Sequence, residues 1–143
     1  MGTFDALLVG ETFSSPARTV SEDDAAALIR IGGYTHPLFT DAAFAAASVF
    51  GGTPLPGEAV LHIMGGLAEQ TDRFDDTVIA LVGFDEVRFR RAVMPGDEIR
   101  LEIEVVGKEP AGDGRGLMMM AWRCLNARDE VACEARARML FRT

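Results

Sequence analysis

The feature that most constrains the fold of this chain is a series of four long strand-like segments in its second half. From Thr77 onward, β-branched residues and alternating apolar and polar residues dominate the sequence. Within residues 97–109, Ile, Leu, Ile and Val alternate with charged residues, which is the two-residue period of a strand with one buried face. Short turns separate the segments, and such turns join antiparallel strands. The segments span residues 78–93, 97–109, 116–128 and 130–143.

The segment 57–70 predicts the longest helix. Large apolar side chains cover most of its helical circumference, so the helix should be mostly buried. Its glycine pair costs about 1 kcal/mol per residue relative to alanine, which suits a close approach by another backbone or a sheet. One line along the helix lacks large apolar side chains, and it consists of Glu58, His62, Gly65, Gly66 and Glu69.

Two shorter helices and a weaker strand precede this segment. Ser21 can cap a helix over 22–31 that has acidic residues in its first turn and stops at Gly32-Gly33. The alanine-rich stretch 41–49 predicts a second helix, and residues 11–20 a fifth strand. We therefore expect an α+β fold of one domain over 1–143, with a long central helix wrapped by a five-stranded antiparallel sheet.

Composition excludes several classes of protein. The net charge of −8 disfavours nucleic acid and anionic membranes as partners, and no apolar run approaches the roughly 18 residues of a membrane span. No N-terminal leader is evident, so a cytoplasmic location is expected. Cys124 and Cys133 lack metal-ligand spacing and are expected to be buried small side chains, with no metal site. An anionic coenzyme would need a local basic patch, for which the candidates are Arg88, Arg90, Arg91, Arg100 and Arg123.

The stretch GGYTHPLFTD, residues 32–41, resembles the signature of the MaoC-like dehydratases and R-specific enoyl-CoA hydratases. Further matches follow in register over essentially the whole chain. They are Gly33, Pro37, Leu38, Asp41, Phe44, Phe50-Gly51, Pro56-Gly57 and Pro95-Gly96-Asp97. The resemblance implies the hotdog fold, a homodimer or an oligomer of dimers, a channel for an acyl-CoA or acyl-carrier thioester at the subunit interface, and no cofactor.

The sequence departs from that family where the chemistry occurs. In the family an Asp and a His activate one water, and here Tyr34 stands at the Asp position and Phe39 at the His position. His36 stands where the family has an Asn. The family's catalytic pair therefore cannot be transferred, although Phe39 keeps a place beside the substrate.

The start of the long helix offers one candidate site. The resemblance implies that a backbone N–H there, at Gly57 after Pro56, polarises the thioester carbonyl, since such groups have no partner within the helix. Spacing alone favours a simple turn into the helix at Pro56-Gly57, and the site is implied only by the resemblance. Glu58 and His62 lie four residues apart on one helix face, so Glu58 can orient His62 and leave the other ring nitrogen of His62 as a base. Alternatively, this polar line meets solvent or a dimer interface.

Tyr34 and His36 are the remaining catalytic candidates. His36 precedes Pro37, which favours a loop or an extended conformation, and its imidazole titrates near neutral pH. Tyr34 can donate a hydroxyl to substrate or water. The alternative for His36 is structural, with its ring bonded to the backbone. Likewise, Met118–Met120 and Trp122 can line an acyl tunnel or simply form the core, and we expect core for at least half of them.

The leading hypothesis is an acyl-thioester hydratase/dehydratase, that is, a hydro-lyase with a non-standard active site. Loss of both usual residues also fits an acyl-CoA-binding subunit without catalysis. A hotdog thioesterase is the third hypothesis, since Glu58 lies near the position of the carboxylate base that the resemblance implies for some such enzymes.

Overall fold

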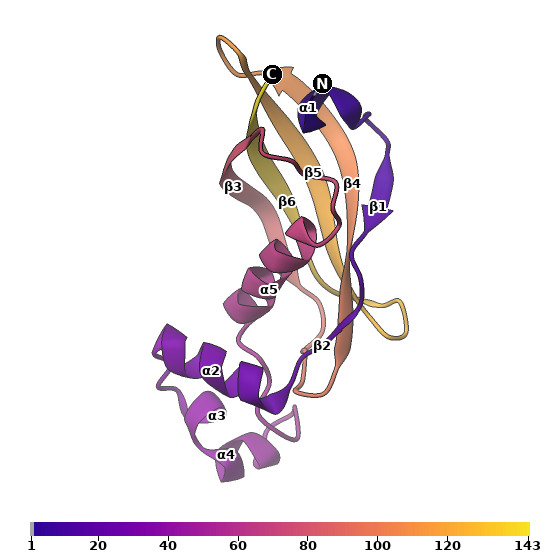
Figure 1. The fold of residues 1–143 in the computed structure, drawn as a ribbon. Coiled ribbons are helices and arrows are strands. Elements are labelled where there is room, and N and C mark those ends of the chain that lie inside the picture. Colours follow the sequence, from indigo (N-terminus) through magenta and orange to yellow (C-terminus); the bar gives the residue numbers. More distant parts are fainter. Residues whose placement is uncertain (1) are drawn as a thin grey trace.

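Four long antiparallel strands form most of the sheet, as predicted. The computed structural model describes residues 2–143, and its sheet has the order β1-β4-β5-β6-β3 (Figure 1). Every paired strand runs antiparallel to its neighbour, so β3 and β1 are the two edges. The long strands are β3 (Val78–Phe89), β4 (Glu98–Pro110), β5 (Arg115–Asn126) and β6 (Val131–Arg142).

The predicted fifth strand is divided in two, so the sheet has six strands and the expected count of five was wrong. β1 (Thr12–Ser14) and β2 (Arg18–Thr19) both pair with β4. Ser15 still exchanges hydrogen bonds with the backbone of Leu101, at 2.8 and 2.9 Å. Pro16 follows and has no N–H to continue the ladder, which accounts for the break. A short helix before β1 was not predicted, α1 (Thr3–Ala6).

The long helix α5 (Gly57–Glu69) lies against the sheet, as predicted (Figure 1). Its buried face packs on the side of the sheet that carries the alternating residues of β4. The line that lacks large apolar side chains is the accessible side of the helix. The buried residues of α5 are Ala59, Val60, Ile63, Met64, Leu67 and Ala68.

Three further helices form an arm beyond one end of the sheet (Figure 1). They are α2 (Glu22–Gly32), α3 (Pro37–Thr40) and α4 (Ala42–Ala47). The predicted cap of α2 is confirmed, because the Ser21 side chain accepts from the Asp24 N–H at 3.0 Å. Gly33 ends α2 with φ +70°, a conformation that glycine adopts without strain. Asp41 caps α4, which is shorter than the predicted 41–49.

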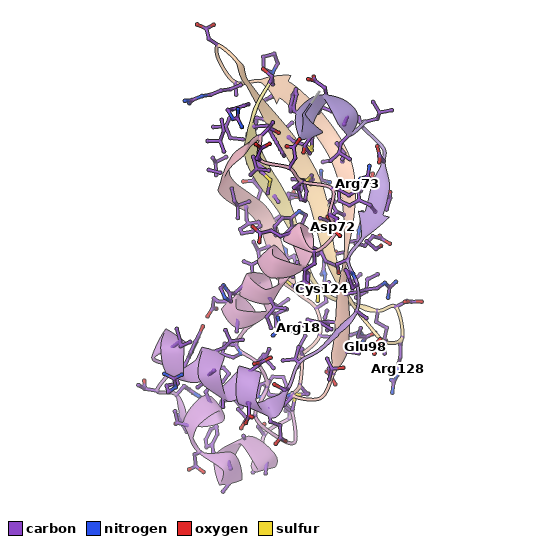
Figure 2. The ribbon with its side chains drawn as sticks, viewed as in Figure 1. Arg18, Asp72, Arg73, Glu98, Cys124 and Arg128 are labelled. Atoms are coloured by element: carbon purple, nitrogen blue, oxygen red, sulfur yellow. The ribbon has the colours of Figure 1, made fainter. Side chains whose placement is uncertain are left out.

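The core between α5 and the sheet holds the sulfur-containing residues of β5. Met118, Met120 and Cys124 are fully buried there, whereas Met119 points to the opposite face of the sheet. Cys124 is labelled in Figure 2 and lies opposite Cys133 on β6. Burial raises the pKa of both thiols, to about 12 and about 11 respectively. The expectation of buried cysteines is confirmed, and most of the methionines are core residues.

Candidate active site

The N-terminus of α5 opens into a cavity of about 340 Å³. Pro56 is the N-cap residue, and its carbonyl accepts from the N–H groups of Ala59 and Val60. The N–H groups of Gly57 and Glu58 have no acceptor within residues 2–143, as expected for a first helical turn. These two groups are therefore available to a carbonyl oxygen, in the position where the helix dipole favours negative charge.

Aromatic side chains line this cavity, and Phe89 lies directly against the helix start. A Cβ atom on Gly57 would come within 2.9 Å of the Phe89 ring, so a glycine fits this contact without displacing the ring. Sequence reasoning missed Phe89, although it is an apolar residue between Arg88 and Arg90 near the end of a strand. The walls also include Leu38, Phe39, Phe50, Pro54, Leu55, Val60, Val93, Ala132 and Cys133.

Tyr34 connects the arm to the start of α5. Its phenol donates a hydrogen bond to Oε2 of Glu58, across 24 residues of sequence. This bond, followed by partial burial and the carboxylate charge, raises the pKa of Tyr34 above its usual value of 10.0. The Tyr34 ring also meets the Phe39 ring edge-on, with centroids 5.2 Å apart. Tyr34, Phe39, Gly57 and Glu58 therefore form one cluster, although they come from two separate segments.

His36 has a structural bond that limits its chemistry. It caps α3, and its Nδ1 accepts from the Leu38 N–H at 3.0 Å. A neutral imidazole with Nδ1 as the acceptor carries its proton on Nε2, so it can donate but offers no free basic nitrogen. The ring lies edge-on to Phe44 and is exposed. Within residues 2–143, no hydrogen bond joins His36 to Tyr34, Glu58 or His62.

His62 lies one turn beyond Glu58, on the rim of a separate groove of about 870 Å³. Across the described chain, Glu58 is bonded to Tyr34 and no bond joins it to His62. The two side chains share a helix face, but the orienting contact of the predicted dyad is absent. The groove runs along the accessible side of α5, between α2 and the first half of β3.

The predicted basic patch is only partly assembled. Arg90 and Arg91 line the mouth of the Gly57 cavity and pair with Glu134 and Glu130 at 2.7 and 2.9 Å. Arg88, Arg90 and Arg123 border a hollow of about 320 Å³ that Arg136 also lines. Arg100 lies apart from these cavities and pairs with Asp129.

Within residues 2–143, no group of three or more His, Cys, Asp or Glu side chains is arranged to hold a metal ion. None of the helices in that part of the chain has the length and apolar character that a bilayer crossing needs.

A long apolar helix packed against a long antiparallel sheet is the arrangement of the hotdog class. A family model described as MaoC like domain matches residues 6–117. The chain therefore belongs to the MaoC-like domain family, and the predicted resemblance and fold class are confirmed.

Two solved structures are similar to nearly the whole chain. The monoamine oxidase regulatory protein from Archaeoglobus is 32% identical, with a TM-score of 0.90 over 98% of this chain and 94% of its own. The MaoC-like dehydratase from Rhodospirillum rubrum is 27% identical, with a TM-score of 0.81 over 97% and 96%.

A curated enzyme is similar to part of the chain. The 3-hydroxyacyl-[acyl-carrier-protein] dehydratase FabZ of Symbiobacterium thermophilum is 36% identical over 90 residues, which are 59% of this chain and 58% of that enzyme. The match therefore spans little more than half of the curated relative.

Proposed function

We propose that this protein adds water to enoyl thioesters and removes it from β-hydroxyacyl thioesters. The observation that carries the proposal is the start of α5, where the N–H groups of Gly57 and Glu58 have no acceptor within residues 2–143, Gly57 lines a largely apolar cavity, and Tyr34 bonds to Glu58. Water addition needs donors for the developing enolate oxygen and a base for the water. The N–H donors and the carboxylate base both belong to two consecutive residues, Gly57 and Glu58. The dehydratases among the similar proteins support the same reaction class.

In the proposed reaction, Glu58 takes a proton from water while the water oxygen bonds to the β-carbon. The electron pair of the double bond moves to the thioester oxygen, where the N–H groups of Gly57 and Glu58 stabilise the enolate. A proton then returns to the α-carbon as the enolate collapses. Tyr34 holds one carboxylate oxygen of Glu58, which leaves the other oxygen for the water. The phenol of Tyr34 has a pKa raised above 10.0, so it is protonated at neutral pH and acts as a donor.

His62 and His36 have secondary places in this proposal. His62 shares the accessible side of α5 with Glu58 and is the second acid–base candidate, able to supply the proton for the α-carbon. His36 stays a candidate only as an Nε2–H donor, because Leu38 occupies its Nδ1. Phe39 lines the Gly57 cavity and Pro56 is the N-cap residue of α5, and both are proposed to shape the thioester pocket.

Coenzyme A and an acyl carrier protein are both candidate carriers of the acyl group. Arg90 and Arg91 at the cavity mouth support an anionic carrier arm despite the net charge of −8. We also propose a homodimer in which a second copy covers the edge strand β3. Ile79, Leu81 and Val82 are exposed apolar residues on that strand, and such an edge is open to pairing. A cytoplasmic location is proposed from the free thiols of Cys124 and Cys133.

Hydration of short and medium enoyl-CoA thioesters by the purified protein tests the proposal. Glu58→Gln should lower kcat by about 100-fold or more, because the residue loses its basic oxygen but keeps its shape. Glu22→Gln is the matched control, since Glu22 is an exposed carboxylate in the first turn of α2. His62→Ala and His36→Ala complete the set, and His62→Ala should have the larger effect. Turnover that is absent from the wild type, or that survives Glu58→Gln, contradicts the proposal.

The same carboxylate beside the helix start also suits a thioesterase. In that reaction Glu58 would activate water for attack on the thioester carbonyl, and the products would be a free acid and a free thiol. A thiol reagent added to the assay separates the two reactions, since hydration leaves the thioester intact. Binding of acyl-CoA without either product would instead identify a non-catalytic subunit.

A further inference from the structure

The groove along α5 contains a polar group that the proposed chemistry does not use. Trp122 of β5 forms part of the groove lining, and its indole Nε1 is buried without an acceptor within residues 2–143. It is the only buried side-chain nitrogen or oxygen in that state among those residues. Leaving a buried N–H unpaired costs free energy, so such a group calls for an explanation.

The neighbours of Trp122 do not supply an acceptor. The Phe84 and Trp122 rings form a T-shaped pair with centroids 5.4 Å apart, and an aromatic ring is at best a weak acceptor. Other groove residues near the sheet include Ile63, Leu81 and Met139, whose side chains are apolar. A tryptophan that served only as core filler could be a phenylalanine here without any buried N–H.

The groove has room for a chain-like ligand. Its volume is about 870 Å³, and a Cβ atom on Gly65 or Gly66 would meet nothing within 4 Å. The polar groups His62 and Glu69 stand on its accessible side, whereas Trp122 is 1% exposed. A ligand that passes the polar groups on the accessible side therefore meets the apolar side chains of Ile63, Leu81 and Met139, with the buried indole N–H of Trp122 beside them.

We infer that the groove, which begins one turn of α5 beyond the Gly57 cavity, binds the far part of the acyl chain of a substrate whose thioester lies at Gly57. This part of the chain carries an oxygen acceptor, such as a keto or ether oxygen, and Trp122 Nε1 donates to this oxygen. Trp122 is thus a specificity residue that favours an oxygenated acyl chain over a plain alkyl chain. The inference rests on the proposed function for the identity of the ligand as an acyl thioester.

The unique tryptophan makes a direct test possible. The chain has one Trp, so ¹⁵N-labelled protein gives one indole N–H resonance. The probes are saturated, unreactive acyl-CoA thioesters of equal length, one with a plain chain and the others with an ether oxygen moved along the chain one position at a time. We expect a downfield shift of the indole proton with at least one ether position and not with the plain chain. Equal shifts, or no shift, from all the probes overturn the inference.

The Trp122→Phe variant supplies the kinetic test. It removes the N–H and keeps an aromatic ring, so the ratio of kcat/KM for oxygenated over plain enoyl chains should fall about tenfold. Phe84→Leu is the matched control, because it changes packing on the same indole without removing the donor, and it should leave this ratio unchanged. An unchanged ratio in Trp122→Phe contradicts the inference.

The two proposals fail in different ways. If the wild type turns over neither chain but an ether probe still shifts the indole resonance, hydration is wrong and the donor site stands. If both chains turn over with no preference and no shift, hydration stands and the role of Trp122 is wrong. Should Trp122→Phe fail to fold, the resonance of the wild type decides alone.

Discussion

The four long strands and the helical arm of residues 22–50 are held in different ways. Along β4, β5 and β6, residues on the side that faces α5 are buried, and Leu101, Met118 and Phe141 have no exposed surface. Within 22–50, only Ala25 and Ala45 are buried. The arm is fixed instead by helix caps and by the hydrogen bond from Tyr34 to Glu58. Stability therefore comes mainly from the sheet with α5, whereas the arm contributes side chains to the candidate active site.

This contrast predicts that truncation in the sheet has the largest effect. Leu101→Ala removes a fully buried side chain and should lower the free energy of unfolding by about 3 kcal/mol. Ile31→Ala on the arm is the control, because Ile31 is 73% exposed, and it should change that free energy by less than about 0.5 kcal/mol. Urea denaturation measures both. Equal losses would mean that the arm is as well packed as the sheet.

The second-largest effect concerns Tyr34, an arm residue whose substitution should change the rate of catalysis more than the stability of the fold. Tyr34→Phe removes the donor to Glu58 and should lower kcat for hydration about tenfold, because the carboxylate loses its fixed orientation. The free energy of unfolding should change by only about 0.5–1 kcal/mol. Steady-state kinetics and urea denaturation of the same preparation test both values. A loss of stability similar to that of Leu101→Ala would contradict the proposed division of roles.

A smaller, spectroscopic effect follows from the raised pKa of Tyr34. The protein has one tyrosine, so ultraviolet absorbance reports its ionisation alone. The midpoint should lie above 10.0 in the wild type and return toward it in Glu58→Ala, which removes the main cause of the shift. Because the folded pKa is raised, the stabilisation from this contact is complete below the unfolded pKa and is lost as pH rises through the folded value. A midpoint that Glu58→Ala leaves unchanged would show that the contact does not exist in solution.

The smallest effect is the loss, at acidic pH, of the stability that Asp75 contributes in the loop before β3. Asp75 accepts from the hydroxyl and the N–H of Thr77 and also interacts with Thr3, which lowers its pKa from 3.8 to about 2. Its stabilisation is therefore present above the unfolded pKa and is lost as pH falls toward about 2. The melting temperature of the wild type should exceed that of Asp75→Asn at mildly acidic pH, and the difference should shrink on acidification. A difference that does not vary with pH would contradict the lowered pKa.

Local patterns in the sequence account for most of the fold. Apolar residues alternate with polar ones along β4, and they cover most of the circumference of α5. Each pattern extends over many residues, so each predicted its element and its buried face. Ser21 and Gly33 predicted the two ends of α2, because capping and left-handed turns depend on neighbouring residues. The division of the N-terminal strand was missed, although Pro16 gave a signal for it.

The candidate site was only partly predictable. The sequence pointed to Tyr34, Gly57 and Glu58 separately, but it paired Glu58 with His62 through the four-residue helical spacing. In the folded chain, Glu58 bonds to Tyr34, and His36 is engaged as a helix cap. The candidate arginines are only partly brought together for a similar reason, because Arg100 pairs with a partner 29 residues away.

The sequence by itself therefore determined the hotdog class, the family and the helix start at Pro56-Gly57, since these depend on local conformation and on the order of motifs. Only the tertiary structure decided which side chains meet. The Tyr34–Glu58 bond, the Phe89 ring against Gly57 and the unpaired indole of Trp122 arise from packing between distant segments. Sequence spacing fixes neighbours along one helix or strand, but the distances between elements depend on how their side chains fill the core.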